Sequence, residues 1–266
     1  MAHNGTARQR RKEAETLPEI PSRWGEASRR TLKTSEIVAL EIVRDIVSQK
    51  LKAGDRLPLE AEMLKHYRVS RSSLREALRL LEVQGLIAIR PGPGAGTVVG
   101  KVLPGNLART LMLYLHMAGA TYDELLDAWI LSEPMMAELA AKNPDRKRVR
   151  EALSPFLEAS DACHGPMRQV AAGLAFHDVV ADLAGNRVLT LLLNVVGFIV
   201  AEHVLTTTKR DELEDRIVDD HKALAEAIIA GKPQAARKLM EEHVRHVVED
   251  FKALWPRRVG EKVQWR

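Results

Sequence analysis

The feature that most constrains the fold is a strand-like region at residues 86–102, in a chain whose other patterns are helical. Leu86–Arg90 and Thr97–Val102 are short apolar runs, and residues 91–96 between them read Pro-Gly-Pro-Gly-Ala-Gly. Two such runs around a Gly/Pro-rich turn predict a β-hairpin.

Three helical segments precede this hairpin. The first begins at Thr34, the second covers residues 59–67 after Pro58, and the third begins after Ser70 and ends at Gly85. The first has apolar residues at helical spacing, and the serine can cap the third helix. Three helices followed by a hairpin predict a winged helix-turn-helix.

Beyond Pro104 no further strand pattern occurs. Gly, Asn and Pro residues divide this part of the chain into predicted helices at 106–118, 122–142, 145–161, 168–184, 187–207, 210–230 and 233–254. No fixed period repeats, so we expect a bundle and not a solenoid. The predicted fold is mainly α, with an N-terminal winged helix-turn-helix and an all-helical C-terminal domain of about seven helices.

These patterns divide the chain into four parts. Residues 34–102 form the expected DNA-binding domain, 106–254 the helical domain, and 255–266 a C-terminal tail. Residues 1–33 are basic, contain Pro18 and Pro21, and have no helical period, so we interpret them as a flexible arm. That arm is either a solvated tail or a source of loose phosphate contacts.

Composition favours an intracellular helical protein. Aromatic residues make up 4% of the chain and the net charge is +4, an excess too small to indicate a nucleic-acid partner by itself. A single cysteine, Cys163, cannot form an intramolecular disulfide, and the N-terminus lacks the apolar core of a signal peptide. The apolar stretch Val188–Ala201 is shorter than the roughly 20 residues of a membrane span. We therefore expect a cytoplasmic protein without membrane contact, in which this stretch is a buried helix.

The third helix has the chemistry of a DNA-reading element. Arg71, Arg75 and Arg79 are four residues apart and share one helix face. Ser70, Ser72 and Ser73 gather at its N-terminus, where hydroxyls and free N–H groups favour a phosphate. An arginine near that end can donate two hydrogen bonds to guanine in the major groove. Most arginine stripes are ordinary solvated faces, so this interpretation depends on the short helix and the hairpin beside it.

Three runs of sequence resemble the GntR family of transcription regulators: residues 54–60 (GDRLPLE), 69–78 (VSRSSLREAL) and 81–87 (LEVQGLI). The resemblance covers residues 34–102. It implies that Arg71 and Arg75 contact DNA, that Ser70, Ser72 and Ser73 hold phosphates, and that the wing, with Arg90 and Gly94, inserts nearby. Family members usually carry an arginine at the position of Ala61, so one contact is missing here, and Arg90 or the N-terminal arm is a candidate to replace it.

The helical part resembles the FadR-type C-terminal domain, called FCD. The motifs are residues 175–177 (AFH) with 185–189 (GNRVL), residues 220–224 (DHKAL), and residues 235–244. The resemblance implies that His177, His221 and His243 bind a divalent metal such as Zn, Ni or Mn beneath a small-molecule pocket. Neutral imidazoles suit such ions, and three helices of a bundle can bring them together. Without the resemblance, three of nine histidines would more simply be surface or core residues.

Two departures from the resemblance concern this site. Metal-binding members carry an aspartate four residues before the first histidine, where this chain has Gly173. They also carry an arginine four residues before a helix glutamate; here the glutamate is Glu133 and the earlier residue is Trp129. We therefore expect an effector bound by Trp129, Gly173 and the three histidines, of carboxylate or fatty acyl type, with the bulkier acyl type favoured by the loss of both charged groups.

The sequence supports a ligand-responsive regulator, and we expect a repressor that binds an inverted-repeat operator as a homodimer. Two alternatives stay open. A metal-dependent enzyme could use the three histidines, although no general base or nucleophile motif accompanies them, so we expect no enzyme. An architectural DNA-binding protein would lack any response to an effector.

Overall fold

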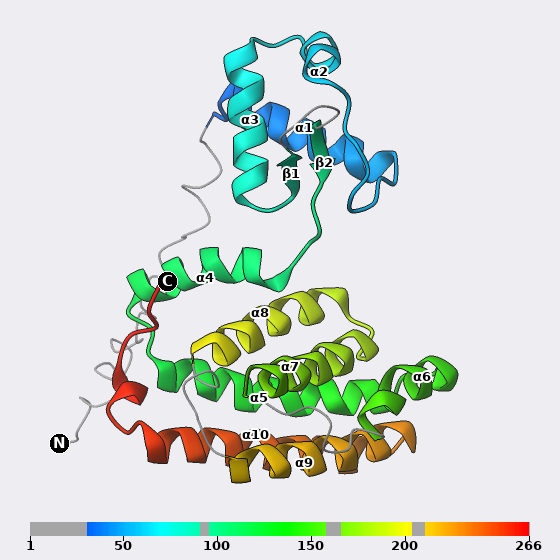
Figure 1. The fold of residues 1–266 in the computed structure, drawn as a ribbon, viewed down its shortest axis with the longest axis vertical. Coiled ribbons are helices and arrows are strands. Elements are labelled where there is room, and N and C mark those ends of the chain that lie inside the picture. The colour runs from blue at the N-terminus through cyan, green and yellow to red at the C-terminus, as the bar shows by residue number, and fades with distance from the viewer. Residues whose placement is uncertain (1–30, 91–95, 158–165, 204–210, 266) are drawn as a thin grey trace, which may run out of the picture.

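A computed structural model describes residues 31–90, 96–157, 166–203 and 211–265. Figure 1 shows three helices and a hairpin at one end of the molecule and a group of longer helices at the other. This confirms a mainly helical fold, with a winged helix-turn-helix ahead of an all-helical domain.

The N-terminal domain contains α1 (Thr34–Ser48), α2 (Glu60–Tyr67), α3 (Arg71–Val83), β1 (Ile87–Arg90) and β2 (Gly96–Val99). Its helices form because apolar residues recur at intervals of three and four, which places them on one face. Val38 and Ile42 of α1 meet Leu74 and Leu78 of α3 in a buried core, which Ile87 of β1 closes from the hairpin side.

A short segment before α2 also hydrogen-bonds to the wing, which the sequence did not indicate. β1 and β2 pair antiparallel, with Ile87 opposite Val99. Gly54 and Leu57, which precede α2, donate backbone hydrogen bonds to β2 at Val99 and Thr97, each with an N···O distance of 2.9 Å. The segment before α2 is thereby fixed to the wing, and α2, α3 and the hairpin form one framework.

Gly85 has two reasons to be a glycine. It follows α3 with a φ of +70°, a left-handed conformation that ends the helix. A Cβ atom at this position would also collide with the side chain of Asn106. The turn after α3 therefore lies directly against the first helix of the C-terminal domain.

Each of the seven predicted helical stretches contains a helix. They are α4 (Pro104–Ala118), α5 (Tyr122–Ala141), α6 (Arg146–Leu157), α7 (Pro166–Leu183), α8 (Arg187–His203), α9 (Asp211–Ile229) and α10 (Pro233–Leu254). α5 is central and packs against α7, α8, α9 and α10. Leu126, Phe176 and Leu224 lie fully buried in the core that these helices share.

The apolar helix α8 serves both core and surface. Val195, Ile199 and Val200 are buried, as expected for a core helix. Val188 and Leu192, nearer its N-terminus, are exposed. No helix of the described residues is long and apolar enough to cross a membrane.

The last residues fold back onto the helical domain, which their interpretation as a tail did not anticipate. After α10 a single 3₁₀ turn, η3 (Arg258–Gly260), leads to Val263, whose side chain is fully buried. Val263 donates its N–H to the carbonyl of Ala120, and Tyr122 donates its own to Glu261. In Figure 1 this segment, in red, rises beside the end of α4.

Candidate DNA-binding surface and histidine site

The N-terminus of α3 is capped as the sequence predicts. Ser70 precedes the helix in extended conformation, and its Oγ accepts the backbone N–H of Ser73 at 3.2 Å. The same Oγ lies 2.9 Å from Oγ of Ser72 and 3.0 Å from Oγ of Ser73. The three hydroxyls therefore form one exposed cluster over the positive end of a helix, which suits a phosphate oxygen.

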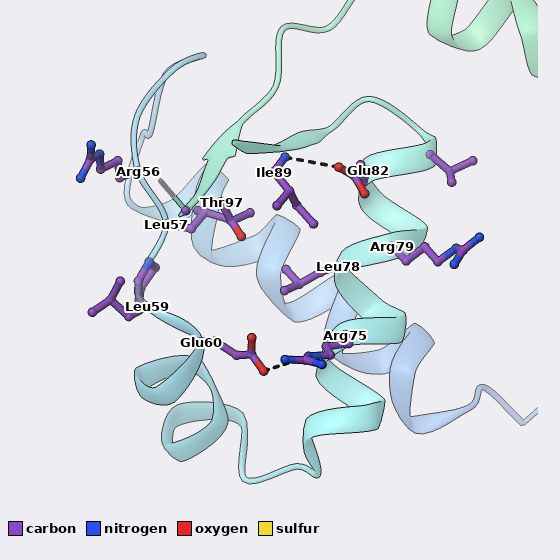
Figure 2. A pocket seen from close by; sticks show the side chains of 13 residues that line it. Arg56, Leu57, Leu59, Glu60, Arg75, Leu78, Arg79, Glu82, Ile89 and Thr97 are labelled. Atoms are coloured by element: carbon purple, nitrogen blue, oxygen red, sulfur yellow. Dashed lines mark hydrogen bonds and ion pairs between the residues drawn. The ribbon is translucent and has the colours of Figure 1, made fainter. Parts of the chain in front are cut away.

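The three arginines of α3 are exposed, but one of them has an internal partner. Nε of Arg75 donates to Oε1 of Glu60, at the start of α2, over 3.1 Å. The two side chains are 70% and 40% exposed, so the pair is a surface ion pair of small net stability. Figure 2 shows Arg75 directed toward Glu60, whereas Arg79 points away from α2.

A groove of about 750 Å³ lies between α3, the start of α2 and the wing. Apolar side chains form much of its floor, and both acidic and basic groups border it. The residues that line the groove are Arg56, Leu57, Pro58, Leu59, Glu60, Arg75, Leu78, Arg79, Glu82, Val83, Ile89, Gly96 and Thr97. The sequence did not single out Glu60 and Glu82, because their position depends on how α2 and the wing pack beside α3.

The wing residues proposed from sequence are only partly described. Arg90 ends β1 and is exposed beside the turn. Gly94 falls in residues 91–95, outside the described residues, as does nearly all of the N-terminal arm, residues 1–30. Ala61 is exposed in the first turn of α2, so the position of the missing arginine faces outward.

In the helical domain, the structure brings His177 of α7, His221 of α9 and His243 of α10 together. One potential ligand atom from each lies within 4.8 Å of the others. Nε2 of His221 and Nε2 of His243 are 3.1 Å apart. The ring of His177 lies 5.3 Å from that of His221 and 5.5 Å from that of His243, measured between centroids.

Two carboxylates orient these rings from outside the cluster. Oε2 of Glu133, on α5, is 2.8 Å from Nδ1 of His177, and Oδ2 of Asp220 is 3.0 Å from Nδ1 of His243. An ionised carboxylate only accepts hydrogen bonds, so each of these two rings carries its proton on Nδ1 and keeps a lone pair on Nε2, which can accept a hydrogen bond or bind a metal. The sequence showed Asp220 as a neighbour of His221, but it serves His243, on another helix.

Burial favours the neutral form of His221 and His243 by lowering the pKa of each. It holds the pKa of His221 well below its ordinary value of 6.5, and the neighbouring His243 and His177 lower it further. Burial also lowers the pKa of His243, although the hydrogen bond that its Nδ1 donates to Asp220 acts in the opposite direction.

Trp129 and Phe176 complete the surroundings of the cluster. Trp129 is 3% exposed, and its Nε1 donates to Oε1 of Glu133 over 3.2 Å. Phe176 stacks on His221 with centroids 4.2 Å apart. Gly173 lies in α7, four residues before His177 and therefore on the same helix face.

The donor set fits a divalent transition metal. At metal–nitrogen distances of about 2.0–2.1 Å, two imidazoles on one ion have nitrogens roughly 3.0–3.4 Å apart, and 3.1 Å lies within that range. The carboxylate–histidine hydrogen bonds are the usual outer partners of metal-binding histidines. Glu133 and Asp220 therefore place two carboxylates directly behind the rings of His177 and His243.

Comparison with known proteins gives the family. Residues 34–99 match "Bacterial regulatory proteins, gntR family", and residues 124–246 match the "FCD domain". An HTH-type transcriptional regulator of Mycobacterium tuberculosis (strain ATCC 25618 / H37Rv) is 30% identical over 217 residues, which are 80% of this chain and 87% of the relative. The chain belongs to the GntR family of bacterial regulatory proteins. It carries an FCD domain on the C-terminal side of its helix-turn-helix domain.

Other GntR-family relatives span nearly the same length. The HTH-type transcriptional regulator LutR of Bacillus subtilis (strain 168) is 29% identical over 76% of this chain and 94% of its own. The HTH-type transcriptional repressor NanR of Citrobacter rodentium is 27% identical over 84% and 86%. These relatives are transcriptional regulators and not enzymes, which sets the enzyme alternative aside. The solved structure of Streptococcus agalactiae GntR has the same fold, with a TM-score of 0.63 and 24% identity over 81% of this chain and 99% of that one.

Proposed function

We propose that this GntR-family protein is a repressor that binds an inverted-repeat operator as a homodimer. Its affinity for DNA would change when a small molecule binds its FCD domain. The observation that carries the proposal is the convergence of three histidines from three helices inside the domain that follows the DNA reader. One relative is named as a transcriptional repressor, which supports repression and not activation as the proposed effect on transcription.

On the DNA side, α3 would enter the major groove. Arg71 and Arg75 are exposed on one face and can reach base edges, while the serine cluster at 70, 72 and 73 would hold a backbone phosphate. Arg90 and Gly94 of the wing would contact the neighbouring backbone or minor groove. Binding through Arg75 requires its ion pair with Glu60 to open or to share the arginine with DNA.

On the sensing side, His177, His221 and His243 would hold Zn, Ni or Mn. The metal would supply a positive charge and an open coordination position for an oxygen of the effector. An effector carboxylate would take that ion as its partner. An effector of fatty acyl type would instead use the apolar neighbours of the cluster, Trp129 among them.

A second copy of the chain is the proposed partner of the exposed face of α4. Leu107, Leu113, Tyr114 and Met117 are exposed on this helix, and Leu191 and Leu192 are exposed on α8, against which α4 packs. Exposed apolar residues grouped on two adjoining helices are typical of a contact surface. A two-fold dimer formed there would present two copies of α3, as an inverted repeat requires.

A thermal-shift screen tests the sensing function. The purified protein is treated with a chelator and then screened with Zn, Ni and Mn, alone and with small carboxylates and acyl compounds. Ligands that stabilise it are added to the protein bound to its DNA, and binding is followed by fluorescence anisotropy. At least one stabilising ligand should change DNA affinity. Stabilising ligands that leave DNA affinity unchanged would favour the architectural alternative.

A further inference from the structure

Glu133 is a buried carboxylate with a donor on each oxygen. The residue is 4% exposed, and it lies on α5 one turn after Trp129. Oε1 accepts the indole N–H of Trp129 at 3.2 Å, and Oε2 is 2.8 Å from Nδ1 of His177. A buried carboxylate is costly unless its oxygens are hydrogen-bonded, so the two donors together make this position tolerable.

The two hydrogen bonds also decide where His177 carries its proton. Because the carboxylate cannot donate, the proton lies on Nδ1, and Nε2 keeps its lone pair. The ring of His177 is held among the other two histidine rings and lies 5.7 Å from the ring of Trp129. The carboxylate therefore fixes both the tautomer and the orientation of the imidazole.

Trp129 has a specific part in this arrangement. An uncharged N–H holds one oxygen in place without neutralising the carboxylate, as an ion pair with lysine or arginine would. The negative charge of Glu133 therefore remains directed at His177, whose basicity as a ligand it increases. With only one donor, the carboxylate would be free to rotate about its last torsion, which is soft.

We propose that Trp129 and Glu133 are positioning residues, which act as a relay that keeps the proton of His177 on Nδ1 and its Nε2 available to a metal. The inference rests on the proposed metal site. It assigns Trp129 to the support of a ligand, where its indole N–H is used inside the protein and is not offered to an effector.

The substitution Glu133→Gln separates this role from simple packing. Glutamine has nearly the same shape but only one acceptor oxygen, so the N–H groups of Trp129 and His177 must compete for it. When the amide nitrogen faces His177 instead, Nδ1 has to accept, and the proton moves to Nε2. In the double variant Trp129→Phe/Glu133→Gln the competition disappears, and the single oxygen can turn to His177.

The first readout is the tautomer of His177 in the metal-free, full-length protein, followed by long-range proton–nitrogen NMR correlation of the histidine rings. Wild type and Trp129→Phe should carry the proton on Nδ1. Glu133→Gln should show a share with the proton on Nε2, and the double variant should return to Nδ1. A wild-type proton on Nε2, or a double variant no different from Glu133→Gln, would overturn the relay.

The second readout is zinc affinity by competition with a chromophoric chelator. Glu133→Gln should weaken zinc binding by about 10–100-fold, the usual effect of losing an outer partner. Trp129→Phe should weaken it less, and in the double variant the loss should be smaller than in Glu133→Gln alone, because the tautomer returns although the charge does not. Trp255→Phe and Glu151→Gln, at exposed positions away from the site, are matched controls and should leave both readouts unchanged.

The two readouts keep the proposals distinguishable. If wild type binds no zinc but the NMR pattern is as expected, the metal site fails and the relay stands as a hydrogen-bonded positioning of His177. If zinc binds tightly and the affinity losses of the two single variants simply add in the double variant, the relay fails and the metal site stands.

Discussion

At the scale of single residues, Arg75, which is proposed to contact DNA, already has an ion-pair partner within the protein. Its ion pair with Glu60 joins α2 to α3, and the high exposure of both side chains means that a phosphate can take the place of Glu60 at the guanidinium. Arg71, one turn earlier, lies at the capped end of the helix. Arg75 would therefore have to give up an ion pair within the protein in order to contact DNA as proposed.

Arg71→Ala and Arg75→Ala should each weaken specific DNA binding by about 1–3 kcal/mol, because each removes a direct contact in the groove. Glu60→Gln should instead strengthen DNA binding, since it weakens the ion pair that holds Arg75 and removes a negative charge from the surface proposed to face DNA. Anisotropy at physiological salt measures all three. Arg150→Ala, in α6, is the control. Normal DNA binding by both arginine variants would contradict the assignment of α3.

The position of Gly173 provides a direct test at the metal site. Gly173→Asp adds a carboxylate one turn before His177, on the same helix face, and should tighten zinc binding in a calorimetric titration. Gly173→Ala is the matched control: both variants remove a helix-interior glycine, which costs roughly 0.5–1 kcal/mol, but only aspartate adds a ligand. Equal zinc affinity in the two variants would show that residue 173 does not reach the ion.

At the scale of elements, the segment after α10 ties three helix ends together. His116, near the end of α4, has Nδ1 2.9 Å from the carbonyl oxygen of Val263. The hydroxyl of Tyr122, at the start of α5, accepts the backbone N–H of Gln264 and lies 2.8 Å from Nδ1 of His203, at the end of α8. This segment therefore anchors the C-terminal end of α4 to the start of α5 and, through Tyr122, to the end of α8.

Val263→Ala should therefore lower the free energy of unfolding by about 1–3 kcal/mol, although the residue lies only two positions before the last described residue. Chemical denaturation measures the loss. Gln264→Ala, whose side chain is exposed, serves as the control. A Val263→Ala variant as stable as wild type would mean that the segment does not pack in solution.

The helices were predictable because each depends on local information. Apolar residues at helical spacing, Ser70 as a cap and Gly85 as a terminator lie within or beside the elements they define. The C-terminal segment was missed because its contacts are backbone hydrogen bonds to residues more than 130 positions earlier, which leave no period in the sequence. The outer partners Glu133 and Asp220 were missed for a similar reason, since each serves a histidine on a different helix.

At the scale of the whole molecule, the proposed inverted-repeat operator requires that two copies of α3 be held at a fixed separation. The exposed apolar residues of α4 lie on the helix that also meets the DNA reader through Asn106 and Gly85. A dimer formed through α4 would therefore set the separation of the two readers directly.

Met117→Glu should convert the dimer into a monomer without unfolding it, because this side chain is 87% exposed and a charge there is penalised only when a second copy covers it. Light scattering at micromolar concentration gives the mass, and circular dichroism verifies the fold. Leu131→Glu, on α5 and 76% exposed, is the matched control. A wild-type protein that is monomeric both free and on DNA would contradict the proposed interface.

The most direct test of the central claim is selection of bound sequences from a pool of random double-stranded DNA by the purified full-length protein. A two-fold dimer reading DNA through α3 predicts an enriched inverted repeat, and an Arg71→Ala/Arg75→Ala variant should not enrich it. Enrichment of the same repeat by that variant, or no shared sequence among the molecules bound by wild type, would contradict the account.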